Sequence, residues 1–357
     1  MAIAIVGSGP AACYTADLLT RALPGLQIDI YERHAEPFGL VRYGVAPDHA
    51  GTKAVSQLFA RMLKKPGVRL HVNVEVGRDL GIDELEDQYQ LVVVATGAGS
   101  GRVPEFTGAT DLPMLTGLQL AALFNGRELA LLDRLPQQAA SIAIFGNGNV
   151  SLDAARLLAK PAGQLAAVGV LQQVIDWRDA LGLQQLHIIG RGNAAQSRFG
   201  HNELRELGNL DAFRPVVQRQ DLAQAQGANA AVLPLLEGFA SQAADARLPI
   251  HLHFDSRLQT YQAGMLSLAK GGHSLSLPVD MAVAAIGQRA APLAGLPYDH
   301  DRACIPNTDG LVEGRDKTYV VGWAANPAGG SIPASRQAAS ALLPRLLARL
   351  EQAQAST

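Results

Sequence analysis

The sequence has little cysteine: Cys13 and Cys304 are the only two in 357 residues. Neither has a second cysteine at Cys-x-x-Cys spacing, so the sequence indicates no disulfide framework, no cysteine zinc site and no adjacent redox-active dithiol. Cys13 falls in the first turns of a helix with a buried pattern, where a small core residue is favoured over a reactive thiol. We therefore assign no functional role to either cysteine and expect no metal site.

The sequence also lacks a charge excess and long apolar runs. Lysine and arginine number 30 against 32 aspartates and glutamates, so no basic excess is available to hold nucleic acid or an anionic membrane surface. No apolar run approaches the roughly 18 residues that span a bilayer. The first strand begins at the N-terminus without a charged leader. From these absences we expect a soluble cytoplasmic protein, and its oligomeric state stays open.

The stretch Gly7-Ser8-Gly9-Pro10-Ala11-Ala12 organises the chain. It follows the apolar run 3–6 and precedes a helical pattern over 13–23, which predicts a strand, a tight turn and a helix. Gly7 permits the turn, Gly9 lets the backbone approach a pyrophosphate, and Ala12 lets the helix pack close to the strand. Free N–H groups at the helix N-terminus favour an anion. The pattern predicts a dinucleotide site that includes Pro10 and Ala11.

Two further strands belong to this first unit. Residues 27–31 read as a strand that ends in Glu32, where a carboxylate can accept a ribose hydroxyl. The apolar run 89–95 reads as a buried parallel strand, and it ends in the glycine-rich segment that contains Gly97. Residues 38–49 have neither strand nor helix periodicity, so we predict a shaped loop that lines the site.

The first pattern recurs later in the chain. A strand over 141–145 is followed by Gly146-Asn147-Gly148-Asn149-Val150-Ser151 and by a helical segment over 152–159. The strand over 186–190 ends in Arg191, at the place where the first unit has Glu32. An arginine there can pair with a ribose 2′-phosphate, which an acidic residue would repel. This predicts the phosphorylated nicotinamide cofactor, and the alternative is a solvated arginine at a strand end.

These repeats predict an α/β protein with two Rossmann-like dinucleotide-binding domains. The Pro- and Gly-rich segment 104–113 reads as a connection, and the strand over 281–286 ends in a glycine as the strand before Gly97 does. We therefore expect one dinucleotide-binding domain over 1–104 and 288–357 and a second over 105–287. Residues 333–350 predict a terminal helix, and residues 351–357 a frayed end.

An ordered set of motifs along nearly the whole chain resembles the adrenodoxin reductase family, whose members are NADPH-dependent, FAD-containing ferredoxin reductases related in architecture to glutathione reductase. The most specific motif is PFGLVRYGVAPDH at 37–49. The others are GSGPAA, Glu32, GNGNVSLDAAR, a strand followed by Gly-Arg with Gln196 and ELREL behind it, GLPYD, IPN and YVVGW.

The resemblance implies that the domain over 1–104 and 288–357 is the FAD-binding domain and that the domain over 105–287 is the NAD(P)H-binding domain, each with its own set of contacts. For FAD, it implies the pyrophosphate turn and Glu32 together with Gly39, Leu40, Val76, Gly97, Trp323, Gly330 and Ile332. For the nicotinamide cofactor, it implies Gly148, Asn149, Val150, Arg191 and Glu203. His49 and Asp153 match a polar pair near the flavin and nicotinamide, with roles in orientation and proton exchange. The alternatives are a loop histidine held by backbone hydrogen bonds and a first-turn helix acid that interacts with the helix dipole.

Three departures from the family pattern bear on function. The second of two adjacent arginines is Gly192 here, so the preference for NADPH over NADH stays open. Ala324-Ala325-Asn326-Pro327-Ala328 replaces a basic segment after the tryptophan, and the chain is shorter than family members usually are. These departures keep a second hypothesis in view, an NAD(P)H-dependent flavoenzyme that reduces oxygen or a small organic substrate. A flavin-binding scaffold with an inactive nicotinamide site is disfavoured, because the second turn and Arg191 are intact.

The principal hypothesis is hydride uptake from NADPH by FAD and release of single electrons to a ferredoxin-type iron-sulfur protein. Such partners are usually acidic, and five arginines fall within one short stretch of the second domain: Arg191, Arg198, Arg205, Arg214 and Arg219. Because acidic residues are interleaved with them, a solvated mixed-charge surface is the alternative interpretation. These acids are Glu203, Glu206, Asp211 and Asp221.

Overall fold

The computed structural model describes residues 1–107, 111–223, 225–241, 248–327 and 330–355. Parts of three segments named above therefore lie outside the described residues: 108–110 of the predicted connection, Ala328 after the tryptophan, and 356–357 at the chain end. The chain forms two compact units, the first over 1–45, 49–100 and 288–357 and the second over 46–48 and 101–287. Short strands β5 (Ser100–Gly101) and β15 (Gln288–Arg289) lie where the chain passes from one unit to the other.

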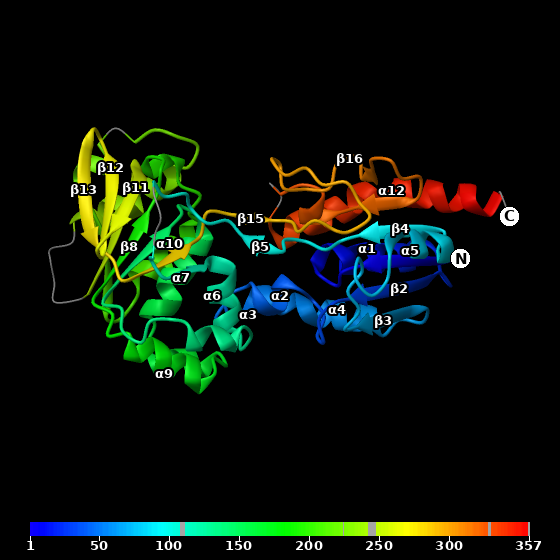
Figure 1. The fold of residues 1–357 in the computed structure, drawn as a ribbon, viewed down its shortest axis with the longest axis horizontal. Helices are drawn as coiled ribbons and strands as arrows, with labels where there is room; N and C mark the ends of the chain where they lie inside the picture. The colour runs from blue at the N-terminus through cyan, green and yellow to red at the C-terminus, as the bar shows by residue number, and fades with distance from the viewer. Residues whose placement is uncertain (108–110, 224, 242–247, 328–329, 356–357) are drawn as a thin grey trace. The chain divides into compact units, whose positions relative to one another are not determined.

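The first unit contains a seven-stranded sheet in the order β16-β17-β18-β4-β1-β2-β3, whose strands from β18 to β3 are parallel (Figure 1). Its strands are β1 (Ala2–Val6), β2 (Gln27–Glu32), β3 (Val68–Val72), β4 (Leu91–Val94), β16 (Asn307–Thr308), β17 (Leu311–Val312) and β18 (Thr318–Val320). Its helices are α1 (Pro10–Ala22), α2 (Leu40–Tyr43), α3 (Ala50–Lys53), α4 (Val55–Leu63), α5 (Ile82–Gln88), the 3-10 turn η5 (Gly322–Ala324) and α12 (Ile332–Ala355).

Apolar cores cover both faces of this sheet. Helices α1, α4 and α12 pack over one face, with Ile3, Ile28 and Leu91 fully buried beneath them. The other face carries Ala4, Val92 and Val94 under α5 and the 290–325 segment. A strand that is buried on both faces needs a continuous apolar run instead of alternation, which explains the sequences of β1 and β4.

The second unit contains a parallel six-stranded sheet in the order β6-β14-β7-β8-β10-β9. Its strands are β6 (Met114–Thr116), β7 (Ser141–Phe145), β8 (Gln185–Ile189), β9 (Phe213–Val217), β10 (Leu248–His253) and β14 (Met281–Ala284). Its helices are α6 (Gly117–Phe124), η1 (Leu129–Asp133), α7 (Asn149–Ala159), α8 (Ala162–Ala167), α9 (Gln172–Ala180), η2 (Ala194–Gln196), α10 (His201–Gly208), η3 (Arg219–Asp221), η4 (Ala230–Val232) and α11 (Leu233–Ser241).

A small antiparallel sheet completes the second unit. Its strands are β11 (Ser256–Gln262), β12 (Met265–Lys270) and β13 (His273–Pro278). Leu266 and Leu268 of β12 pack against Ala143 and Phe145 of β7, so this sheet covers one face of the parallel sheet (Figure 1). The helices bury the larger core on the opposite face. The two parallel sheets confirm the predicted α/β class.

Two local predictions were wrong. The segment 38–49 is not loop throughout, because Phe38 and Gly39 have positive φ angles of 86° and 50° and turn the chain into the short helix α2. The terminal helix does not end at residue 350 but continues to Ala355, since Leu346 and Leu350 are buried against the core and hold its last turns. Among the helices of the described ranges, none is both long and apolar enough to cross a membrane.

Candidate functional site

The two glycine turns have the same local geometry. Gly7 has a φ of +98°, and a Cβ there would lie 2.5 Å from the carbonyl oxygen of Ala95, at the end of β4. Gly146 has a φ of +139°, and a Cβ there would lie 2.3 Å from the carbonyl oxygen of Ala285, just after β14. In both turns the first glycine is therefore required by backbone conformation and by close approach to the neighbouring strand.

The first turn leaves a site for an anion at the start of α1. The helix begins at Pro10 with Gly9 as its N-cap, and proline at this place costs no hydrogen bond. A Cβ on Gly9 would meet no other part of the protein within 4 Å, so the backbone itself does not demand this glycine. Ala12 is fully buried against β1, as the motif requires. The open space beside Gly9 fits close access of a ligand to the backbone.

Glu32 lies at the end of β2 beside this turn, and Ser8 fixes its side chain. The backbone N–H and the hydroxyl of Ser8 donate to Glu32 Oε2 at 3.2 and 2.5 Å. The N–H of His34 donates to Glu32 Oε1 at 2.9 Å. A carboxylate offers about four acceptor positions, so Glu32 retains capacity for a ribose hydroxyl. Ser8 was not predicted, because its role depends on a partner on another strand.

Two further glycines bring distant segments to the first turn. A Cβ on Gly39 would lie 3.3 Å from Gly9 Cα, and the N–H of Phe38 donates to the Ser8 carbonyl at 3.1 Å. A Cβ on Gly322 would lie 2.7 Å from Ala11 Cβ. The segments that begin at residues 38 and 322 therefore border the same turn, as expected for one dinucleotide site.

Unpaired polar atoms occur near this turn. Thr96 Oγ1, directly after β4, and Trp323 Nε1 are buried without a hydrogen-bond partner among the described residues. The Trp323 ring lies against Gly330, where a Cβ would be 2.0 Å from Cζ2. Buried polar atoms are normally paired, so these atoms fit a polar cofactor that supplies the missing partners.

The remaining predicted FAD contacts differ in their surroundings. Val76 is 5% exposed and belongs to the apolar core, which gives no sign of a cofactor contact. Gly97 has a φ of +68° and no protein atom within 4 Å of a Cβ position. Leu40 begins α2, and Ile332 begins α12 and packs against the core.

In the second unit, the turn Gly146–Ser151 leads into α7. Gly148 is the N-cap of α7, and Ser151 is fully buried, with its hydroxyl donating to the Gly148 carbonyl at 2.6 Å. The small third position is therefore a packing requirement that serine satisfies. Asn147 Nδ2 is buried without a hydrogen-bond partner in the described chain, and Val150 is 44% exposed. An unpaired amide and an exposed apolar side chain at this turn fit a nucleotide with an aromatic end.

Arg191 follows β8, as predicted, and its side chain is exposed with no ion pair among the described residues. Glu203 lies in the first turn of α10, and its carboxylate lies close to Gly200, where a Cβ would be 2.0 Å from Oε2. The N–H of Gly200 donates to Asn149 Oδ1 at 2.5 Å, which ties this segment to the second turn. Asn149 and Glu203 are thereby brought close to each other, and Arg191 is left available for an anion.

Asp153 belongs to an ion-pair network that the sequence did not reveal. Arg156 donates to Asp153 Oδ1 at 2.9 Å and to both carboxylate oxygens of Asp48 at 2.8 and 2.9 Å. Lys160 also contacts Asp48, and Glu206 lies 3.4 Å from Arg156 Nη1. Asp153 is thus not the first-turn helix acid of the alternative interpretation, since it lies beyond the first turn of α7 and pairs with Arg156.

Burial and charge act in opposite directions in this network. Burial by itself raises the pKa of the Asp48 carboxyl, but hydrogen bonds from Arg156 and Lys160 outweigh it and hold the pKa well below its usual range. Burial likewise lowers the pKa of Arg156, and Asp48 and Asp153 more than reverse this effect. Asp48 belongs to the second unit, whereas His49, the N-cap of α3, belongs to the first. The pairing of His49 with Asp153 stays a prediction.

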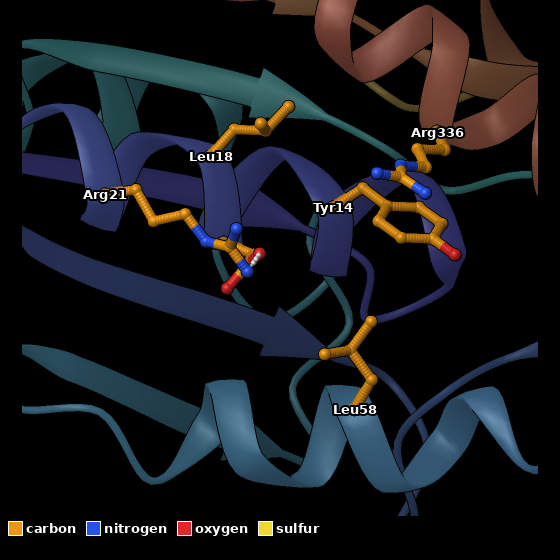
Figure 2. Close-up of a pocket in the computed structure, with 6 residues that line it drawn as sticks. Tyr14, Leu18, Arg21, Leu58 and Arg336 are labelled. Atoms are coloured by element: carbon orange, nitrogen blue, oxygen red, sulfur yellow. Dashed lines mark ion pairs between the residues drawn. The ribbon is translucent and has the colours of Figure 1, made fainter.

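A small surface pocket of about 130 Å³ in the first unit lies between α1, α4 and α12 (Figure 2). Arg21 pairs with Asp17 at 2.7 Å on its wall, and the Tyr14 ring and Arg336 line its other end (Figure 2). Ligand pockets are usually about 300–1,000 Å³. None of the predicted site residues lines this pocket, so it is not the dinucleotide site.

Comparison with known proteins identifies the family. Residues 1–187 match the family model of the pyridine nucleotide-disulphide oxidoreductases. The NADPH-ferredoxin reductase FprA of Mycobacterium tuberculosis is 30% identical, over 98% of this chain and 84% of that protein. This chain is a member of the adrenodoxin reductase family. The cindoxin reductase of Citrobacter braakii is 32% identical, over 97% of this chain and 77% of that protein.

A solved structure agrees with the sequence comparison. The structure of Mycobacterium tuberculosis FprA in complex with NADPH matches 99% of this chain and 85% of that chain, with 28% identity and a TM-score of 0.93. The predicted class, an NAD(P)H-dependent flavoprotein oxidoreductase with FAD and NADPH as cofactors, is confirmed by this membership. The turn at Gly7–Ala12 with its unpaired neighbours fits FAD, and the turn at Gly146–Ser151 fits the nicotinamide nucleotide.

Proposed function

We propose that this chain takes hydride from NADPH onto bound FAD and passes electrons singly to a ferredoxin-type iron-sulfur protein. The observation that carries the proposal is the contrast between two equivalent turns. Glu32 stands behind the first turn and Arg191 behind its repeat, so the first suits an unphosphorylated ribose and the second a 2′-phosphate. The unit over 1–45, 49–100 and 288–357 is the FAD domain, and the unit over 46–48 and 101–287 is the NADPH domain.

In the FAD domain, the N–H groups at the start of α1 bind the pyrophosphate and Gly9 allows its close approach. Glu32, oriented by Ser8, accepts a ribose hydroxyl. Trp323 and Thr96 offer the flavin end a donor and a hydroxyl that lack protein partners. When bound, FAD supplies the hydride acceptance and one-electron release that no side chain of this protein can provide.

In the NADPH domain, the N–H groups at the start of α7 bind the pyrophosphate, and Arg191 binds the 2′-phosphate. Val150, exposed at the start of α7, gives the nicotinamide end an apolar contact. His49 and Asp153 orient the reacting groups and exchange protons, and no strong acid or base is required of them. Asp48 and Arg156 hold Asp153 in place from the same network.

The proposed partner is an acidic iron-sulfur protein that docks on arginines of the NADPH domain. Arg205 and Arg219 are exposed, contact only His201 and Ser241 through their side chains, and have no ion pair within the described part of the chain. Three of the interleaved acids have other contacts: Glu206 lies by Arg156, Asp211 accepts from Gln164, and Asp221 pairs with Lys270. These three acids therefore do not pair with Arg205 or Arg219. Location in the cytoplasm is part of the same proposal.

The test is anaerobic reduction of the purified yellow holoprotein. NADPH is expected to bleach the flavin absorbance, and added ferredoxin to restore it as electrons leave. Failure to bleach with either NADPH or NADH would remove the proposed activity. Bleaching followed by rapid peroxide formation in air, with no ferredoxin-dependent step, would favour a flavoenzyme that reduces oxygen or a small organic substrate.

A further inference from the structure

Arg198 lies on a segment that is bonded directly to the second glycine turn. Its backbone N–H donates to the Asn147 carbonyl at 2.6 Å, and residues 148 and 198 form an isolated parallel bridge. A Cβ on Gly148 would lie 3.7 Å from Arg198 Cβ. Two residues further on, Gly200 is bonded to Asn149 Oδ1 at 2.5 Å. The Arg198 side chain therefore starts beside the backbone of the turn.

The guanidinium of Arg198 is available for a ligand. The residue is exposed, and no hydrogen bond or ion pair of its side chain occurs among the residues that the structure describes. The nearby arginines are engaged: Arg156 contacts Asp48, and Arg205 contacts His201 Nδ1 at 3.1 Å. Arg198 thus differs from its neighbours in having a free charge directly against the turn.

The residues next to Arg198 and to the turn also lack partners. Ser197 is 3% exposed, and its hydroxyl has no hydrogen-bond partner in the described chain. Asn147 Nδ2 is likewise buried without a hydrogen-bond partner among the described residues. Because buried polar atoms are normally satisfied, two unpaired groups beside the turn are an independent sign that a polar ligand belongs there.

We infer that Arg198 binds the pyrophosphate of the nicotinamide nucleotide, an inference that rests on the proposed function. The backbone N–H of Arg198 is bonded to the Asn147 carbonyl and Arg198 is the bridge partner of Gly148, at the turn whose N–H groups suit a pyrophosphate. Arg191 follows β8, the neighbouring strand, and is assigned the 2′-phosphate. The two arginines therefore recognise different phosphates of one ligand.

The assignment of one phosphate group to each arginine bears on Gly192, which stands where the family has a second arginine. A Cβ at position 192 would lie 2.9 Å from Gln196 Oε1, and this side chain caps the N–H of Asn193 at 3.1 Å. A larger side chain at 192 would have to displace the Gln196 side chain from this cap. Arg191 alone then separates NADPH from NADH, whereas Arg198 adds affinity for the pyrophosphate that both share.

Calorimetric titration of the FAD-loaded protein with three probes separates the two roles. NADP⁺ carries the pyrophosphate and the 2′-phosphate. ADP-ribose carries the pyrophosphate alone, and 2′-AMP carries the 2′-phosphate alone. Arg198→Ala is expected to weaken NADP⁺ and ADP-ribose about tenfold, as loss of one charge-assisted contact implies, and to leave 2′-AMP unchanged. Arg191→Ala is expected to weaken NADP⁺ and 2′-AMP and to leave ADP-ribose unchanged.

Arg205→Ala is the matched control, because it removes a nearby exposed arginine that is not bonded to the turn, and wild-type affinity for all three probes is expected. Arg198→Lys should restore part of the ADP-ribose affinity, and an unchanged flavin spectrum shows that each variant is folded. Wild-type binding by Arg198→Ala, or loss of 2′-AMP affinity alone, would overturn the inference and leave the proposed function standing. A wild-type protein that binds neither NADP⁺ nor ADP-ribose would overturn both.

Discussion

The carboxylate of Asp48 accepts hydrogen bonds from both Nε and Nη2 of Arg156, at 2.8 and 2.9 Å, although 108 residues separate the two in sequence. Both side chains are almost fully buried, at 8% and 3% exposure. Because two parallel hydrogen bonds join them, the pair fixes the relative orientation of the two side chains as well as their distance. It holds residues 46–48 to the rest of the second unit and holds the arginine that contacts Asp153.

Asp48→Asn is expected to destabilise the protein. The substitution leaves the buried Arg156 with weaker partners, and breaking a buried pair by removing one member costs about 3–5 kcal/mol. Because Asp153 still contacts Arg156, we expect about 2–3 kcal/mol in urea unfolding. Asp309→Asn, which breaks the exposed pair with Arg345, is the control and should cost less than about 1 kcal/mol. Equal effects of the two substitutions would contradict this account.

Three buried histidines are expected to make the stability of the second unit depend on pH. His187, His251 and His253 stack on β8 and β10, and His187 Nδ1 lies 3.0 Å from His253 Nε2. Burial lowers the pKa of all three, and the charge of Lys270 and of the neighbouring histidines lowers that of His253 further. Protonation is therefore easier in the unfolded chain than in the folded one.

The sign of the effect follows from these lowered values. Stability from the neutral histidines is complete above the unfolded pKa of about 6.5 and is lost as pH falls toward the lowered folded values. Thermal unfolding measured from pH 7 to pH 4.5 should show a falling midpoint. His253→Gln should flatten this profile, whereas His273→Gln, at an exposed position on β13, should not. A His253→Gln profile as steep as the wild-type profile would be inconsistent with the explanation.

Gly7→Ala is expected to lower the stability of the apoprotein, whereas Gly9→Ala is expected to weaken FAD binding. Alanine at position 7 requires a positive φ and a 2.5 Å contact with the Ala95 carbonyl, so it should destabilise the apoprotein by about 2–4 kcal/mol. Alanine at position 9 fits the backbone φ of -72° and meets no protein atom within 4 Å. It should leave apoprotein stability unchanged and weaken FAD binding at least about tenfold, because the methyl group stands where the pyrophosphate approaches. Fluorescence titration with FAD measures this, and wild-type affinity would exclude Gly9 from the FAD site.

Electron transfer to ferredoxin is expected to depend on salt. If the exposed charges of Arg205 and Arg219 attract an acidic partner, the association rate should fall steeply as ionic strength rises past about 0.1 M, where the Debye length is about 10 Å. Stopped-flow reduction of ferredoxin by prereduced enzyme measures the rate. Arg219→Ala should lower the slope of this salt dependence, and Arg345→Ala, in the first unit, is the control. A rate independent of salt would rule out electrostatic docking.

The sequence predicted what depends on local spacing. Both turns, both strand-end residues Glu32 and Arg191, and the buried runs of β1 and β4 follow from glycine placement and hydrophobic period. The sequence did not predict contacts between distant segments, such as Ser8 with Glu32 or Asp48 with Arg156, because no local pattern marks them. Asp48 lies within the most specific motif, directly before His49, and only the structure shows its partner.

Two misjudged boundaries have the same cause. The end of α12 depends on Leu350 packing against the core of the FAD domain, and α2 depends on the positive φ angles of Phe38 and Gly39. A positive φ is rare for a bulky residue such as phenylalanine, so the sequence does not predict it at Phe38. The position of Arg198 beside the second turn likewise depends on a backbone hydrogen bond between distant segments, which no local pattern marks.

The central claim is that electrons from NADPH leave one at a time through an iron-sulfur protein. The most direct measurement is steady-state oxidation of NADPH by the holoprotein in air, with cytochrome c reduction and peroxide followed together, with and without ferredoxin. The account predicts that cytochrome c is reduced only when ferredoxin is present, and that nearly all electrons of the consumed NADPH appear in it. NADPH consumption at the same rate without ferredoxin, with the electrons recovered as peroxide, would contradict it.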